Sequence, residues 1–388
     1  MTAPGQKPYR RVVFFGDVMR TGSDNGKCWQ NSNILLFHHI LAPIFKSAFE
    51  LDDVRYAIAG EGEGEIDQIA LYGMLGDEFT QHNWASYFCG HKRLSAQAEA
   101  YLLSHFQDAF VMGFEMSKSL CDFLRTYNIP FINAAVGPMQ FLDDFTFAFH
   151  SDDKTVMDKL CAYNIEEDLY SAYAGIVRAT AERCPWTATV PSGSSALFCA
   201  VTYNDRNLCK PEGGFRTFMD YRETVESIIK SHDYVYFRAH PYGGNTEDEA
   251  AFFRQFPNVL FIDVNIYWLF CRVPGLKKVV SLCSSASQEA AYFGLEGMLL
   301  TAPSLPLHKG RQPAASYQDN YINILSEFWD GAFWQDVLGH LFVKRRNPVK
   351  IPFLPNRLRD IRWTYGPASF LSLTPQDHAY HSALPDKK

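Results

Sequence analysis

A turn rich in hydroxyl side chains joins an apolar run to a helical pattern in KKVVSLCSSASQEAAYFG, residues 277–294. The first turn of a helix presents unpaired backbone N–H groups and a partial positive charge, and nearby serine hydroxyls add further donors. Ser284 and Ser285 therefore suit a phosphate group, although either serine could instead only cap the helix. Their place after an inner strand favours the phosphate interpretation, and the pattern leaves both open.

A second candidate is His240 in VYFRAHPYGG, residues 235–244, where an aromatic strand ends before a Gly-Gly loop. A histidine here can donate a hydrogen bond to a phosphate oxygen or share a proton with a leaving group. A single histidine at a strand end can also be purely structural. Arg238 and the two glycines, which allow close backbone approach, bring the functional interpretation level with the structural one.

Carboxylates provide the third kind of candidate. Asp205 follows the apolar strand SALFCAVTY (195–203) and could be a helix cap, a base or a covalent nucleophile. Asp143 and Asp144 lie in FLDDFTF, and because adjacent side chains point in different directions, at most one of them should face a cleft. No carboxylate–histidine cluster has metal-ligand spacing, so we expect a metal-independent site.

Alternating strand and helix patterns should position these residues. Apolar runs such as RVVFFGDV (11–18) and DAFVMGFEM (108–116) alternate with helical segments, which predicts parallel sheets. PWTATVPSGSS (185–195) is the best linker, and a second strand–helix series follows it. We therefore predict an α/β protein with two Rossmann-like lobes in the GT-B-type arrangement of many glycosyltransferases. The expected units are an acceptor domain (1–188), a donor domain (189–345) and a segment packing back across the lobes (346–388).

Composition narrows the function classes. The 388 residues carry a net charge of −7, which argues against nucleic acid as a partner because phosphate-backbone binding needs a basic face. Nine cysteines without a CxxC pair indicate reduced thiols. There is no signal-peptide pattern and no apolar run of ~18 residues that could span a bilayer. We expect a cytoplasmic protein, peripheral at the inner membrane.

The order of three segments resembles a known family. ALFCAVTYNDR, then FRAHP, then SLCSSASQEAAYFGLEGMLL is similar to the bacterial retaining β-Kdo glycosyltransferases. These include the O-antigen chain-terminating β-Kdo transferase module and the related capsule-linker Kdo transferases. The resemblance covers about 140–300, and the first 140 residues match by architecture only. Val-Thr-Tyr-Asn replaces the family's Val-Pro-Gly-Gln-type strand end, which puts the alignment of Asp205 in doubt by a residue or two.

The resemblance implies CMP-Kdo as donor, no metal, and retention of anomeric configuration through an Asp-linked glycosyl-enzyme intermediate. Asp205 would be the nucleophile, and Asp143 or Asp144 would activate the acceptor, a bacterial surface glycan that we expect to be lipid-linked. The implied donor-binding residues are Arg238, His240, Ser284, Ser285, Ser287 and Glu289. Lys309 and Arg311, in the loop PLHKGRQP, follow the last expected strand and are assigned to the donor's carboxylate from position alone.

Other functions stay open from sequence. A two-lobed transferase or epimerase could use CMP-sialic acid or a UDP-sugar instead. A non-enzymatic alternative is a sugar-binding module of a polysaccharide-assembly complex, in which protein partners or additional modules of the same polypeptide would complete the assembly.

Overall fold

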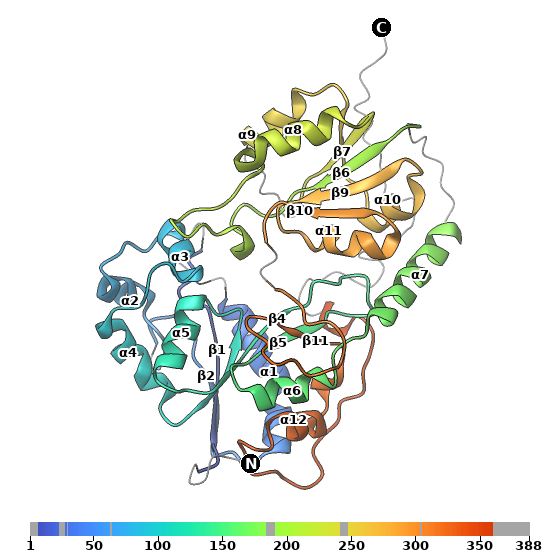
Figure 1. The fold of residues 1–388 in the computed structure, drawn as a ribbon. Helices are drawn as coiled ribbons and strands as arrows, with labels where there is room; N and C mark the ends of the chain where they lie inside the picture. Colours follow the sequence, from blue (N-terminus) through green and yellow to red (C-terminus); the bar gives the residue numbers. More distant parts are fainter. Residues whose placement is uncertain are drawn as a thin grey trace.

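The computed structural model describes residues 7–22, 28, 30–62, 64–183, 191–240, 247–302 and 305–359. Two α/β lobes lie one above the other, each built on its own sheet (Figure 1). The predicted fold class, two Rossmann-like lobes, is confirmed. In the described part of the chain no helix is both long enough and apolar enough to cross a membrane.

The first sheet has six strands in the order β11-β5-β4-β3-β1-β2. They are β1 (Arg11–Gly16), β2 (Asp53–Tyr56), β3 (Phe110–Phe114), β4 (Phe131–Val136), β5 (Phe147–His150) and β11 (Ile322–Ile324). The first four strands pair in parallel, whereas β5 and β11 are antiparallel additions. Both faces of the inner strand β3 are buried, which explains its unbroken apolar sequence FVMGF.

Helices cover this sheet and begin where short polar side chains cap them. Ser95, Ser117 and Asp153 each accept a hydrogen bond from a backbone N–H in the first turn of the helix that follows. The helices are α1 (Asn31–Ala48), α2 (Gln68–Leu75), α3 (Gln81–Phe88), α4 (Ala96–Phe106), α5 (Lys118–Thr126), α6 (Lys154–Cys161) and α12 (Gly331–Leu338), with a short 3-10 turn, η4 (Glu327–Trp329).

The second sheet has five parallel strands in the order β10-β9-β6-β7-β8. They are β6 (Ser195–Cys199), β7 (Tyr234–Arg238), β8 (Val259–Ile262), β9 (Leu276–Ser281) and β10 (Glu296–Leu299). The accompanying helices are α8 (Arg222–Lys230), α9 (Glu247–Arg254), α10 (Ile266–Arg272) and α11 (Ser285–Glu289), with 3-10 turns η1 (Arg206–Leu208), η2 (Phe218–Tyr221) and η3 (Ala290–Phe293).

Strand order reverses once in each parallel region. In the first sheet the chain goes from β1 to β2 on one side and then crosses to β3 on the other. In the second it goes from β6 through β7 to β8 and then crosses to β9. Ligands of open α/β sheets bind beyond the carboxyl ends of the strands at such reversals. The two places to search are therefore the loops after β1 and β3 and the loops after β6 and β9.

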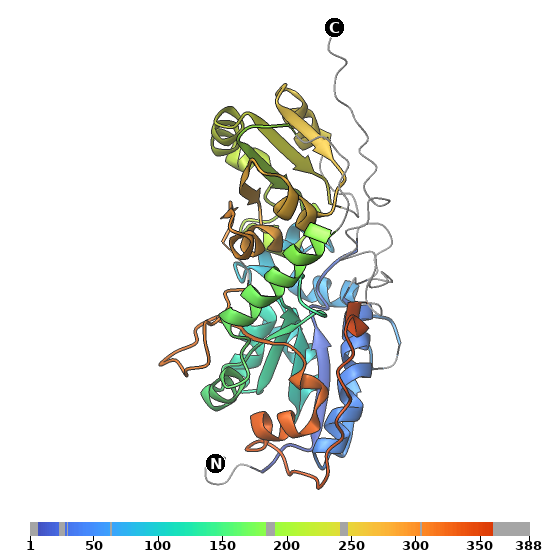
Figure 2. The same cartoon turned by 90° about the vertical axis from the view of Figure 1, so that its right-hand side faces the viewer.

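The packing divides the chain differently from the expected domain boundaries. Helix α7 (Glu167–Arg183) packs into the core of the second lobe through residues such as Ala174 and Val177, and it runs along both lobes in Figure 2. Beyond residue 305 the chain returns to the first lobe, where β11 pairs with β5 and α12 packs on α1. Placing all of 189–345 in the donor domain is therefore wrong, because β11 and α12 complete the first lobe.

Candidate active site between the two lobes

The loops after β3 and β6 meet between the lobes. Nη2 of Arg206 lies 3.5 Å from Oε1 of Glu115, and both side chains are only about one-tenth exposed (11% and 10%). Oε2 of Glu115 accepts a hydrogen bond of 3.1 Å from Nε2 of Gln30. Glu115 has a left-handed backbone, with φ of +50°, which is unusual for a buried residue that is not glycine. Such strain is often found at functional positions, so Glu115 is a candidate site residue.

The loop after β1 adds a second contact between the lobes. Asp17 is fully buried and its Oδ2 accepts a 2.7 Å hydrogen bond from the indole N–H of Trp84. The guanidinium of Arg20 lies over the Trp84 ring, 4.9 Å from its centroid, and Nη2 of Arg20 donates to the carbonyl oxygen of Asn204. Burial raises the pKa of Asp17 to about 6, although Trp84 and Arg20 oppose the shift. Asp17 thus orients Trp84, which in turn supports Arg20 against the second lobe.

Asp205, the predicted nucleophile, follows β6 immediately before Arg206. Its Oδ1 accepts a 2.8 Å hydrogen bond from the backbone N–H of Asn207, so it caps the short turn η1. Half-buried Asp205 acts on the charge of His240: burial and Arg238 lower the pKa of this histidine, and Asp205 opposes them. Asp205 and His240 thus interact through charge. The guanidinium of Arg238 makes a different contact: its Nε donates a hydrogen bond to the carbonyl oxygen of Val264.

The serine turn lies after β9, beside the β6 loop. Ser284 is the N-cap of α11 and its hydroxyl accepts from the backbone N–H of Ala286, so the capping interpretation is correct for this side chain. Ser285 begins the helix and is half-buried. Ser287 is buried and its hydroxyl shares a 2.8 Å hydrogen bond with Ser281, a contact internal to the second lobe. Ser285 is therefore the remaining candidate for donating a hydrogen bond to a phosphate. The hydroxyl of Ser287 is already bonded to Ser281 in the core of the second lobe.

The predicted acceptor-activating pair has structural partners. Asp144 is buried and accepts hydrogen bonds from the backbone N–H groups of Phe145, Leu358 and Arg359. Burial raises its pKa and these three donors oppose the shift. Oδ2 of Asp143 accepts a 2.6 Å hydrogen bond from the hydroxyl of Tyr173 on α7. Both carboxylates hold the chain together, and these contacts argue against either one as the acceptor base.

Lys309 and Arg311, which were assigned to the donor's carboxylate, lie between β10, the last strand of the second sheet, and β11, which belongs to the first sheet. They lie on the exposed loop that projects beside the first lobe, seen in Figure 2. Nε of Arg311 donates to the carbonyl oxygen of Asn164 and pairs with Glu166 at 3.1 Å. The assignment is wrong because the chain has already returned to the first lobe.

Glu289 also differs from its expected role as a donor ligand. Its side chain has no exposed surface, one carboxylate oxygen accepts from the backbone N–H of Gln140, and the other accepts from the hydroxyl of Tyr267 at 3.1 Å. Burial raises the pKa of Glu289 to about 7, opposed by these two donors and by the charge of Arg359. These contacts join the lobes and do not line a ligand site.

Sequence reasoning missed Asp17, Arg20, Glu115 and Arg206. Asp17 and Glu115 directly follow apolar strands, so the strand-end rule applied to Asp205 could have found them. The strand order that selects these two loops over others is not visible in the sequence.

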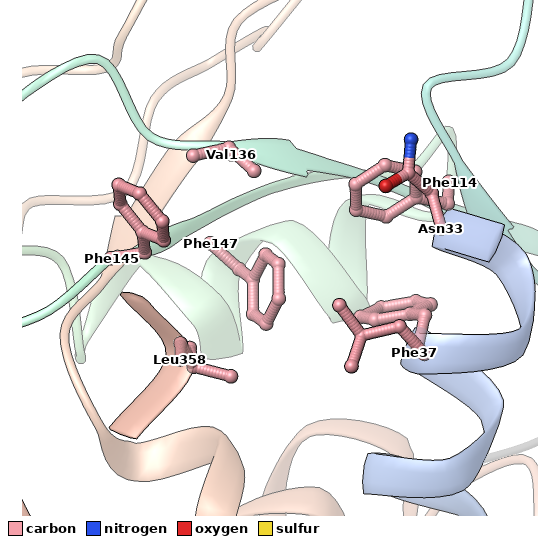
Figure 3. Close-up of a pocket in the computed structure, with 8 residues that line it drawn as sticks. Asn33, Phe37, Phe114, Val136, Phe145, Phe147 and Leu358 are labelled. Atoms are coloured by element: carbon pink, nitrogen blue, oxygen red, sulfur yellow. The ribbon is translucent and has the colours of Figure 1, made fainter. Parts of the chain in front are cut away.

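Two further searches bear on the site. Among the described residues, no group of three or more histidine, cysteine, aspartate or glutamate side chains could hold a metal ion. Figure 3 shows a small cavity in the first lobe, where Asn33 is the single polar residue among aromatic and aliphatic ones. It is lined by Asn33, Leu36, Phe37, Phe114, Val136, Phe145, Phe147 and Leu358. This lining lacks the polar groups that a sugar or phosphate needs.

Comparison with known proteins identifies no family for this chain. No protein-family model matches the chain, and no curated protein matches it. Among solved structures it is similar to Thermosulfurimonas dismutans KpsC, a β-Kdo 2,7 transferase. The identity is 13% and the TM-score is 0.32, over 66% of this chain and 86% of that chain. A likeness at this level carries no argument about donor or mechanism.

Proposed function

We propose that the chain is a glycosyltransferase that moves Kdo from CMP-Kdo to a bacterial surface-glycan acceptor with retention of configuration. The observation that supports a transferase is the meeting of the two strand-order reversals, with Arg20 and Arg206 bridging the lobes. A donor on one sheet and an acceptor on the other would come together there. The choice of CMP-Kdo rests on the sequence resemblance of the Asp205, His240 and Ser284 segments.

The second lobe would supply the donor chemistry. A carboxylate oxygen of Asp205 forms a bond to the anomeric carbon while the bond from that carbon to the CMP phosphate breaks, and CMP leaves with the electron pair. Negative charge then grows on the phosphate. His240 and the backbone N–H groups beside Ser285 are suited to stabilise this charge as CMP departs.

The first lobe would supply the acceptor base, and Glu115 replaces Asp143 and Asp144 in that role. An acceptor hydroxyl attacks the anomeric carbon, the bond to Asp205 breaks, and the hydroxyl proton passes to the Glu115 carboxylate. Arg206 lies 3.5 Å from that carboxylate, and Gln30 donates a hydrogen bond to it that fixes its orientation.

Arg20 and Arg206 also replace Lys309 and Arg311 as partners for the carboxylate of the donor sugar. Both guanidinium groups lower the pKa of Asp17, and both contact the other lobe, Arg20 at Asn204 and Arg206 at Glu115. The 3.5 Å separation of Arg206 and Glu115 exceeds the 2.7–2.9 Å of a tight charge-assisted hydrogen bond. An incoming carboxylate can therefore compete for Arg206 and leave Glu115 available to the acceptor.

The test combines binding with turnover. CMP, UDP and UDP-sugars are compared by thermal shift, and CMP-Kdo is then assayed with a lipid-linked glycan acceptor. We expect CMP to stabilise the protein and Kdo to be transferred. Stabilisation by UDP and not by CMP contradicts the Kdo donor, release of an altered UDP-sugar without acceptor indicates an epimerase, and CMP binding without turnover on any acceptor favours a binding module.

A further inference from the structure

Residues 137–144, within the loop between β4 and β5, belong to the first lobe by sequence and to the second lobe by packing. Met139, Phe141 and Leu142 are buried in the hydrophobic core that also contains Trp268 and Phe293. The Phe141 ring lies 5.5 Å from the ring of Phe293, edge to face. Burying three large apolar side chains stabilises the contact between the loop and the second lobe. This packing joins the two lobes.

Glu289 fixes the same loop by hydrogen bonds. It lies at the last position of α11, whose first turn carries Ser284 and Ser285. Its carboxylate accepts from the backbone N–H of Gln140 in the loop and from the hydroxyl of Tyr267 on α10. A buried carboxylate that loses a donor is left unsatisfied, which is unfavourable because water cannot replace the donor. The position of α11 is therefore coupled to the loop.

Arg359 holds the loop from its other side. Its Nη2 donates to the carbonyl oxygens of Gln140 at 2.6 Å and Leu142 at 2.9 Å, and the side chain is fully buried. Tyr267 and Arg359 both lower the pKa of Glu289, and the charge of Glu289 raises the pKa of Cys199 on β6. Gln140 thus donates to Glu289 through its N–H and accepts from Arg359 through its carbonyl.

We propose that Glu289 is a positioning residue: it anchors α11 to the loop 137–144 and so sets where the Ser284–Ser285 turn stands across the cleft. The role of that turn in holding the donor rests on the proposed function, whereas the anchor itself rests on the contacts above. Glu289 acts through Gln140 and Tyr267 and touches neither donor nor acceptor.

Hydrogen exchange tests the anchor without any ligand. In Glu289→Ala, protection of the backbone amides of 137–144 should fall at least tenfold, whereas Gln288→Ala, on the same helix, should leave it unchanged. Should Glu289→Ala fail to fold, Glu289→Gln serves instead, with a smaller loss of protection because one amide oxygen remains as acceptor. Unchanged protection in both Glu289 variants overturns the anchor, whether or not the protein binds CMP.

Donor binding tests the positioning role. Tyr267→Phe removes the second hydrogen-bond donor to Glu289, and Tyr267 lies on α10, outside the serine turn. The variant should weaken CMP binding severalfold, as Glu289→Ala should. The ratio of CMP dissociation constants between Glu289→Gln and wild type should also change between pH 6 and pH 8, where the carboxylate ionises. A constant ratio together with wild-type CMP binding in Tyr267→Phe overturns the role. A wild-type protein that fails to bind CMP but loses protection in Glu289→Ala contradicts only the proposed donor.

Discussion

Arg206 of the second lobe faces Glu115 of the first lobe, with 3.5 Å between Nη2 and Oε1. Arg206 is next to the predicted nucleophile Asp205, and Glu115 directly follows β3. Neither side chain is more than about one-tenth exposed, so the charges are poorly screened and each depends on the other. Removing one charge should therefore affect the other as well as the substrate.

The first prediction concerns Glu115. Glu115→Gln keeps the shape of the side chain and the contact with Gln30 but removes the base, so kcat should fall by ~10²-fold or more. CMP binding, measured by thermal shift, should stay within about twofold of wild type because CMP lacks the sugar carboxylate that Arg206 would pair with. Wild-type kcat in Glu115→Gln contradicts the assignment of Glu115 as base, and Asp143→Asn and Asp144→Asn are the comparison variants.

The second prediction concerns Asp205. Asp205→Ala should abolish transfer from CMP-Kdo because no carboxylate remains to trap the anomeric centre. The change also removes the cap of η1, which costs ~1 kcal/mol and should leave the fold intact. Circular dichroism and CMP-induced stabilisation serve as controls for folding and donor binding. Full activity of the variant contradicts the nucleophile assignment.

The elements that position the site could be predicted from sequence because their physics is local. RVVFFG and SALFC are buried apolar runs followed by polar turns, and both form inner strands of parallel sheets. Ser284 and Asp205 were recognised as possible caps and both cap. These predictions depend only on neighbours in the chain.

The failures of sequence reasoning all involve contacts between distant residues. Asp144 looked available, and it is occupied by the backbone N–H groups of residues 358 and 359, more than 200 positions away. Arg311 was assigned to the donor lobe because the return of the chain to the first sheet at β11 leaves no local signal. The place of Glu115 after an apolar strand is a local signal, but its pairing with Arg206 of the other lobe is not.

The third prediction follows from the occupied carboxylate of Asp144. Asp144→Asn cannot accept at both oxygens, so backbone N–H groups near residue 358 lose a partner and stability should fall by ~1–3 kcal/mol. Asp143→Asn keeps an oxygen for the single bond from Tyr173 and should cost less. Urea denaturation of the two variants measures the difference, and equal stabilities contradict the structural role of Asp144.

The fourth prediction concerns the pH dependence that buried Asp17 imposes. The pKa of Asp17 is about 6 in the folded protein, against 3.8 for an unperturbed aspartate, because burial disfavours its charge. Between these values the folded state binds a proton that the unfolded state has released, so stability falls as pH rises from about 4 to about 6. Moving the pKa of Asp17 from 3.8 to about 6 lowers the free energy of unfolding by ~3 kcal/mol over this range.

Asp17→Asn keeps an acceptor for Trp84 and lacks the charge. Its stability relative to wild type should therefore increase with pH over this range, as measured by urea denaturation at pH 4.5 and 7.5. Trp84→Phe, which removes the indole donor, should steepen the loss of stability with pH. A pH-independent difference between Asp17→Asn and wild type contradicts the raised pKa.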